Sequence, residues 1–260
     1  MHGRWAWMLL AFVSPGAGAA DTDTTGAVIR DQADVRSLAG GRLLYRESHY
    51  VPRGSMSERW VLYCCPDGKP FARKRVLAST TATTPDFMLE DGGDGYREGV
   101  RGGGAERVVY AGAGGGKESA RTLSVPADGV IDAGFDAAVR KHWDALQRGE
   151  AVSLRFLVPS RKQFFPVRVQ RVAGHDPPGA STMRLRMRIA TWFGFAVPDV
   201  TLVYGLRDGR LRTFSGTGNV RDAKGRNPQV RIAFAPQPAT ATRDEFARIQ
   251  RLPLDGRCPF

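Results

Sequence analysis

Aromatic and basic side chains come together at two places in the second half of the chain. Aromatic rings favour boundaries between apolar and polar surroundings, and neighbouring cations can bind an anionic head group. Such groups predict the rim of a cavity for an amphipathic or lipidic anionic ligand, or a patch that contacts acyl chains. Ordinary packing at the edge of a core is the alternative. The residues are Arg161, Lys162, Phe164, Phe165, Trp192, Phe193 and Phe195.

Arginines alternate with apolar residues between positions 183 and 189. This period of two is typical of a β-strand with one buried face. Arg184, Arg186 and Arg188 would then share one face, where guanidinium groups can bind phosphate or carboxylate. Similar alternation recurs in residues 167–172 and 230–234. The sequence therefore predicts a sheet with an apolar concave face and an arginine-rich outer face.

Motifs for nucleotides and metals are incomplete. Residues 111–118 imitate a phosphate-binding loop but lack its first glycine and the Ser or Thr after Lys117. Residues 91–95 resemble the start of a calcium loop, but Gly93 occupies a ligand position. Beyond residue 20, no histidine has a second ligand at a local spacing. We therefore expect no cofactor, no metal site and no catalytic residues with a local signature.

The cysteines are Cys64, Cys65 and Cys258. In an oxidising compartment we expect Cys258 to form a disulfide with Cys64 or Cys65. Adjacent residues of a strand point to opposite faces, so only one of the two can reach Cys258 easily. The remaining thiol would be free or buried.

The first 20 residues have the pattern of a secretory signal peptide. Arg4 gives a positive start, residues 5–13 are apolar, and small residues precede Asp21. The apolar run is too short for a transmembrane helix, which needs about 20 residues, and no later stretch could span a membrane. We therefore expect a periplasmic protein with no transmembrane segment.

Positive charge is concentrated in the second half of the chain. The net charge is +12 over 260 residues, residues 21–130 are balanced, and residues 131–260 carry the excess. A basic surface attracts anionic partners. For an exported protein, those partners are lipid or other anionic envelope components rather than nucleic acid. A solvated basic surface that aids solubility is the alternative.

Short strand-like runs bounded by turn residues predict a mainly β (α+β) fold. We expect a curved antiparallel sheet or half-barrel of about 10–12 strands. One amphipathic helix is predicted over residues 132–148, capped by Asp132 and ended by Gly149. Its apolar stripe consists of Phe135, Val139, Trp143 and Leu146. The spacing of Thr242 and Glu245 predicts a second, short helix near the C-terminus.

The predicted organisation has three parts. Residues 1–20 form the signal peptide, residues 21–40 form a polar, poorly ordered segment, and residues 41–260 form a single antiparallel β domain with the packed helix.

Several segments resemble exported proteins of unknown function from Gram-negative bacteria. The matching segments are residues 66–69 (PDGK), 85–99 (PDFMLEDGGDGYREG), 123–146 (LSVPADGVIDAGFDAAVRKHWDAL), 156–161 (FLVPSR) and 216–234 (GTGNVRDAKGRNPQVRIAF). The resemblance implies no catalytic residues. More distantly, the pattern is similar to periplasmic half-barrels that carry lipoproteins or lipids, which implies an open sheet closed by helices over an apolar cavity.

Three functions are consistent with these patterns. The first is a periplasmic carrier whose sheet encloses the acyl chains of an anionic ligand. The second is an envelope scaffold or interaction protein with a basic surface and a filled interior. The third is a hydrolase whose site is assembled only in three dimensions. The state of the sheet's interior, hollow or filled, separates the first from the second.

Overall fold

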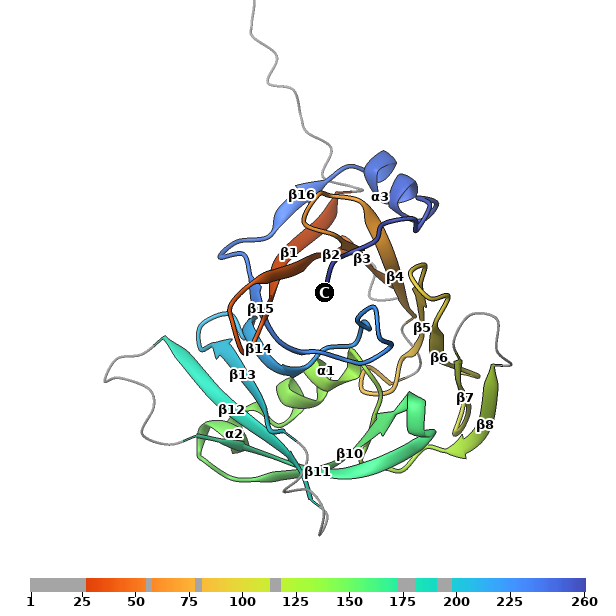
Figure 1. Ribbon diagram of the computed structural model, residues 1–260. Helices are drawn as coiled ribbons and strands as arrows, with labels where there is room; N and C mark the ends of the chain where they lie inside the picture. Colours follow the sequence, from red (N-terminus) through yellow and green to blue (C-terminus); the bar gives the residue numbers. More distant parts are fainter. Residues whose placement is uncertain (1–26, 55–57, 78–80, 113–117, 173–180, 191–197) are drawn as a thin grey trace, which may run out of the picture.

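A single curved sheet of 16 strands forms the framework of the protein (Figure 1). The computed structural model describes residues 27–54, 58–77, 81–112, 118–172, 181–190 and 198–260. The first strands are β1 (Val28–Ser37), β2 (Leu43–Pro52), β3 (Glu58–Cys64), β4 (Pro70–Leu77), β5 (Asp86–Asp91), β6 (Arg97–Arg101), β7 (Glu106–Gly112) and β8 (Ser119–Ser124). The later strands are β9 (Gly129–Val130), β10 (Val152–Val158), β11 (Gln163–Arg171), β12 (Thr182–Ile189), β13 (Val200–Gly205), β14 (Leu211–Thr217), β15 (Gln229–Phe234) and β16 (Ala239–Ala241).

Two antiparallel meanders meet at the pair β1–β15. The strand order is β8-β7-β6-β5-β4-β3-β2-β1-β15-β14-β13-β12-β11-β10-β9, with β16 pairing β1. Neighbouring strands are antiparallel except for the short parallel pair of β9 and β10. The expectation of a curved antiparallel sheet is confirmed, but the expected 10–12 strands are too few. The strand-like sequence patterns did not indicate β1, β6, β9 and β16.

The expectation of a poorly ordered segment over residues 21–40 is wrong for residues 28–37. These residues form β1, which pairs with β2, β15 and β16. Val28 and Val35 are buried, while the intervening polar residues face outward or make ion pairs. The sequence of β1 is largely polar. Pairing with β2, β15 and β16 stabilises it as a strand, rather than burial of its own apolar residues.

The predicted helix over residues 132–148 is divided. It consists of α1 (Gly134–Lys141) and α2 (Trp143–Gln147), separated by His142, whose φ of −107° is not helical. Asp132 does not cap the helix: it has φ +43°, and its carboxylate accepts from the Lys74 Nζ at 2.9 Å. Lys74 is buried and needs a counter-charge, and this need outweighs the capping role. Gly149, with φ +84°, follows the end of α2 as expected.

Side chains occupy the concave side of both halves of the sheet. In the second half, Val139 of α1 and Leu146 of α2 are buried against β10–β13, with Phe135 and Trp143 packed beside them. In the first half, the C-terminal segment (residues 252–260) enters the ring formed by β1–β5 and β15 (Figure 1). The Phe260 ring lies there among the core side chains.

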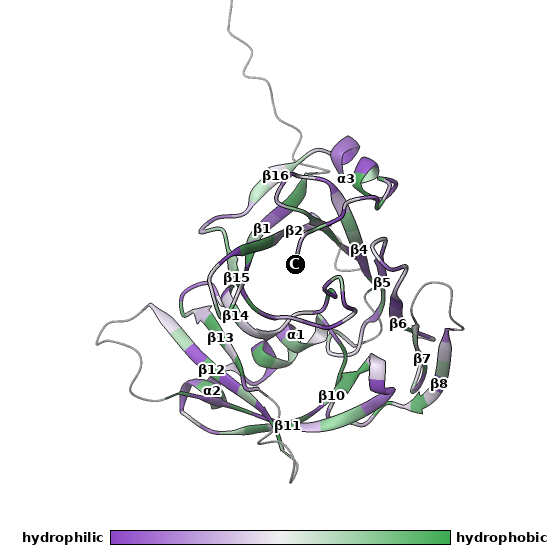
Figure 2. Cartoon of the chain, viewed as in Figure 1, coloured by the Kyte–Doolittle hydropathy of each residue, from purple (hydrophilic) through white to green (hydrophobic). Residues whose placement is uncertain are grey.

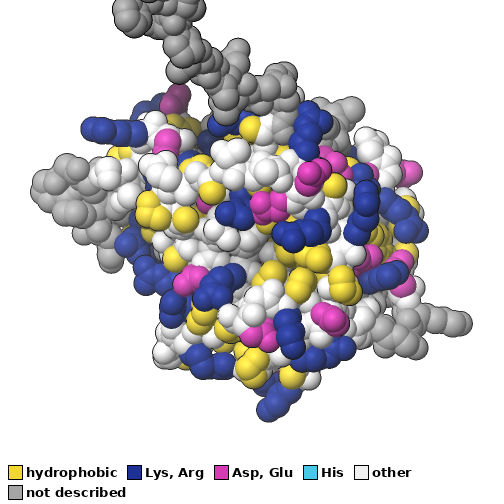
Figure 3. All heavy atoms as spheres, turned by 90° about the horizontal axis from the view of Figure 1, so that it is seen from above, with side chains coloured by type: hydrophobic (Ala, Val, Ile, Leu, Met, Phe, Trp, Pro, Cys, Tyr) yellow, Lys and Arg dark blue, Asp and Glu magenta, His cyan; other side chains and the backbone are white. Residues whose placement is uncertain are grey.

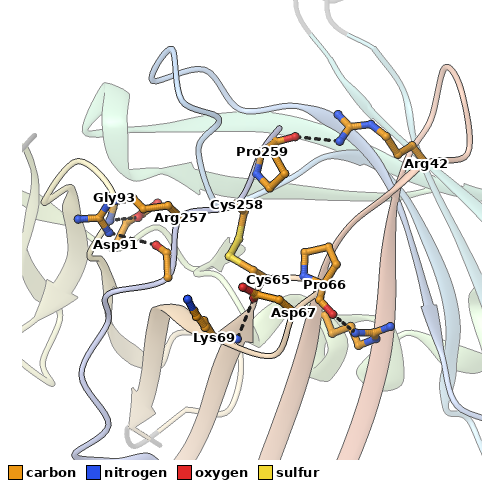
Figure 4. The surroundings of a disulfide bond; sticks show 12 residues. Arg42, Cys65, Pro66, Asp67, Lys69, Asp91, Gly93, Arg257, Cys258 and Pro259 are labelled. Atoms are coloured by element: carbon orange, nitrogen blue, oxygen red, sulfur yellow. Dashed lines mark hydrogen bonds between the residues drawn. A yellow bond between two sulfur atoms is a disulfide. The ribbon is translucent and has the colours of Figure 1, made fainter.

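A disulfide holds the C-terminal segment in place. Cys258 pairs with Cys65, one of its two predicted partners, while Cys64 is a half-buried free thiol. Figure 4 shows Cys258 reaching the turn after β3, with Pro259 accepting from Arg42 at 2.8 Å. The Phe260 ring centroid is 5.4 Å from that of Tyr45. The bond thus joins the last residues of the chain to the centre of the first meander.

The predicted C-terminal helix is α3 (Arg243–Ile249), which packs on the outside of β1–β4. The Thr242 side chain accepts from the Glu245 backbone N–H at 3.0 Å, as predicted. The reciprocal half of the capping box is absent, because the Glu245 carboxylate binds Arg30 at 2.8 Å and Tyr50 at 2.9 Å. This helix is therefore fixed to the sheet by charge as well as by apolar contact.

Two sets of predicted residues lie outside the described part of the chain. They are the signal-peptide residues 1–20 and the aromatic residues Trp192, Phe193 and Phe195. None of the helices in the described ranges has the length and apolar character required for a membrane span.

Candidate functional site

Arginines cover the convex outer side of the second meander. Strands β10–β13 pack apolar residues against α1 and α2, and β15 packs Val230 and Ile232 into the core of the first meander. In each strand these residues alternate with residues that face outward. Figure 2 shows this alternation as green and purple stretches along β12. We call the outward arginines of these strands the basic sheet face. Its members are Arg155, Arg168, Arg184, Arg186, Arg188 and Arg231.

The composition of these strands makes the face strongly positive. Strands β10–β15 contain no Asp, no Glu and no Lys, so every charge they carry is a guanidinium group. Guanidinium groups present planar forks of donors that match carboxylate and phosphate geometry. By contrast, the top of the molecule mixes Lys and Arg with Asp and Glu (Figure 3). On the strands of the basic sheet face, positive charge is therefore separated from negative charge.

The strand register places like charges directly opposite each other. Arg168 of β11 faces Arg188 of β12, and Arg231 of β15 faces Arg36 of β1. Like charges in direct register destabilise a sheet. An anion bound between them would remove this repulsion. The register thus supports anion binding more strongly than the number of arginines alone.

The acidic residues near the face lie outside its strands. Asp199 lies 2.9 Å from Arg188 and 3.7 Å from Arg186. Asp128 lies 3.7 Å from Arg155. All five side chains are more than a third exposed, and ion pairs of this kind contribute only about 0–1 kcal/mol. A ligand anion can therefore compete for these arginines at low cost.

Four of the seven predicted ligand-binding residues lie in the described part of the chain, in and beside the β10–β11 hairpin. Phe164 packs into the main core, and Phe165 is partly buried opposite Phe156 in the β10–β11 pair. Arg161 is exposed in the one-turn helix η1 (Pro159–Arg161), and Lys162 follows it with φ +47°. Arg161 and Lys162 form the tip of the β10–β11 hairpin, where η1 contacts β6 and β7 of the first meander.

Sequence reasoning missed part of this site. The Arg184–Arg188 row was predicted, and the alternation around Arg168 and Arg231 pointed to the same face. The proximity of Arg36 was not foreseen, because β1 was expected to be poorly ordered. Only the pairing of β1 with β15 places Arg36 beside Arg231.

Ionisable groups also meet inside the first meander. Lys74 and Asp132 form an ion pair at 2.9 Å, and Glu98 accepts from the Tyr96 hydroxyl at 2.8 Å. Burial raises the pKa of Glu98 to about 7, and the nearby Asp132 carboxylate acts in the same direction. Within the described ranges, no group of three or more His, Cys, Asp or Glu side chains could hold a metal ion. These contacts give the ionisable groups in the interior of the first meander their polar partners.

Comparisons with known proteins give the fold context. No protein-family model matches the sequence, and neither does any curated protein. The chain is similar to the crystal structure of a β-barrel-like protein of the domain of unknown function DUF1849 from Brucella abortus. The two are 9% identical, with a TM-score of 0.47 over 82% of this chain and 99% of that chain. A likeness at this level supports no inference about function.

Proposed function

We propose that this protein is an envelope interaction protein that binds an anionic component of the cell envelope through its basic sheet face. The observation that carries the proposal is the segregation of charge on β10–β15, whose outward arginines have no acidic residue on their own strands. The in-register pair of Arg168 and Arg188 adds a place where one anionic group could be held between two guanidinium groups.

The packing of α1, α2 and the C-terminal segment against the concave side favours an interaction protein over a carrier. A carrier needs an apolar hollow large enough for acyl chains. In the described residues, Leu146 and Val139 occupy the second meander, and Phe260 and Val220 lie in the core of the first. The convex side offers a surface whose strands carry charge of one sign only.

A periplasmic location is part of this proposal. It is supported by the signal-like pattern of residues 1–20 and by the Cys65–Cys258 disulfide, since disulfides persist in oxidising compartments. Export would expose the face to envelope polyanions and keep it away from most nucleic acid.

Co-sedimentation with purified envelope fragments tests the function. The face variant replaces arginines of the basic sheet face, as Arg168→Gln, Arg188→Gln and Arg231→Gln. The control variant removes the same charge from exposed arginines elsewhere, as Arg53→Gln, Arg121→Gln and Arg251→Gln. We expect wild type and control to sediment with the fragments and the face variant to remain in solution.

Salt provides the second criterion. Binding through exposed charges should weaken steeply as the ionic strength rises above the physiological level, because the screening length falls below about 8 Å. Equal sedimentation of the face and control variants, or binding that salt does not alter, would contradict the proposal.

A further inference from the structure

A row of polar side chains crosses five strands on the convex surface. In successive strand pairs, Arg186 faces Thr201, Thr201 faces Ser215, Ser215 faces Arg231, and Arg231 faces Arg36. Gln170 of β11 extends the row by one strand. We call these residues the polar row. It combines three guanidinium groups with two hydroxyl groups and one amide group, and no apolar side chain interrupts it.

The centre of the polar row is accessible and has spare hydrogen-bonding capacity. Gln170 and Arg231 are exposed, and Thr201 and Ser215 are partly exposed. Within the described ranges, the side chains of Thr201, Ser215 and Arg231 form no hydrogen bond or ion pair with other residues. Arg36 donates to the Gly41 carbonyl at 3.2 Å and to Asp34 at 3.1 Å, so it is partly engaged. A ligand could therefore use most of the row without displacing internal contacts.

The shape of the surface separates two kinds of anionic partner. The sheet curves around its contents, so its outer side is convex along the direction of the row (Figure 1). A flat bilayer would touch only part of a convex row. A flexible chain molecule can follow the curvature and contact every strand in turn.

We propose that the polar row binds an acidic polysaccharide chain laid across β11–β15 and β1. This inference rests on the proposed function and specifies its partner. The acid groups of the chain would pair with Arg186, Arg231 and Arg36, and sugar hydroxyls would hydrogen-bond to Thr201 and Ser215 between them. A polymer whose only polar groups are anionic would leave these two hydroxyls without a partner.

The spacing of the row requires a chain of some length. Adjacent strands lie about 4.8 Å apart, so Arg186 and Arg231 are separated by about 14 Å and Arg36 lies one strand farther. A short sugar acid cannot reach both Arg186 and Arg231. A long chain can reach all three at once, and its affinity gains from the high effective concentration of the second and third acid groups.

Binding to defined probes tests the inference. Wild-type protein is titrated with long-chain polygalacturonate, with digalacturonate and with phosphatidylglycerol vesicles, all at the same low ionic strength. We expect saturable binding of polygalacturonate, at least about tenfold weaker binding of digalacturonate per acid group, and weaker binding of the vesicles than of the polymer.

A hydroxyl variant tests the row itself without changing charge. Thr201→Val combined with Ser215→Ala should weaken polygalacturonate binding at least about fivefold, since each lost hydrogen bond costs about 1 kcal/mol. The matched control is Thr213→Val, which lies on the same face but in the neighbouring row opposite Val203. The control should leave polymer binding unchanged, and neither variant should alter vesicle binding.

The outcomes distinguish this inference from the function on which it depends. Binding of vesicles but not of polygalacturonate would overturn the polysaccharide inference and leave the basic sheet face as an anion-binding surface. Equal loss of polymer binding in the Thr201→Val and Ser215→Ala variant and in Thr213→Val would contradict the assignment of the polymer to the polar row. Absence of binding to every anionic probe would overturn both proposals.

Discussion

Replacing Cys258 by Ser should lower the free energy of unfolding by about 5 kcal/mol, because the disulfide closes a loop with a sequence separation of 193 residues. In the chain-entropy treatment the stabilisation grows with the logarithm of loop length, so this loop lies at the upper end of the usual range. The substitution also releases the Phe260 ring, whose centroid lies 5.4 Å from Tyr45 and 6.0 Å from Phe71.

Urea unfolding of oxidised protein, followed by tryptophan fluorescence, measures this change. Cys64→Ser is the matched control, because it removes a half-buried thiol and leaves the disulfide intact. We expect the control to unfold close to the wild type. Reductant should bring the wild type and the control close to the stability of Cys258→Ser, which should itself respond little. Equal urea midpoints for oxidised wild type and Cys258→Ser would refute the reasoning.

Three further substitutions test individual contacts. Glu98→Gln should flatten the pH dependence of stability. Burial raises the Glu98 pKa from 4.5 to about 7, so the wild type should lose stability as the pH rises from 4.5 to 7. Urea midpoints that change in parallel for both proteins over this pH range would contradict the prediction. Thr242→Ala removes the cap of α3 and should cost about 1 kcal/mol in thermal unfolding; an unchanged melting temperature would argue against the cap. Gly134→Ala would direct a Cβ onto the Thr83 carbonyl oxygen and should cost about 1–3 kcal/mol. In Gly104→Ala the Cβ would make only an ordinary contact with the Gly102 carbonyl oxygen, so this variant should be neutral. Similar melting temperatures for the two glycine variants would contradict this packing.

The sequence predicted an element correctly where all the residues that define it lie in one strand or turn. The alternation around Leu185 predicted both the strand β12 and its arginine face. The spacing of Thr242 and Glu245 predicted the start of α3. Both patterns depend on residues that are close in sequence, so no knowledge of distant partners was needed.

The remaining features depend on partners that are distant in sequence. β1 is polar and became recognisable as a strand only through its pairing with β2 and β15. Asp132 has the right position for a helix cap, but its carboxylate accepts from the buried Lys74 instead. The position of the C-terminal segment inside the first meander has no local sequence pattern, so the packing of Phe260 there could not be predicted. The aromatic segment containing Trp192 lies outside the described residues, and its role stays a prediction.

Arginine protection measures the central claim most directly. A dicarbonyl reagent that modifies guanidinium groups is applied to the protein with and without saturating polygalacturonate, and modified residues are quantified by mass spectrometry. The account predicts that the polymer protects Arg186, Arg231 and Arg36 and leaves Arg53 and Arg121 as reactive as before. Uniform protection of all five arginines, or no protection in the polar row, would contradict it.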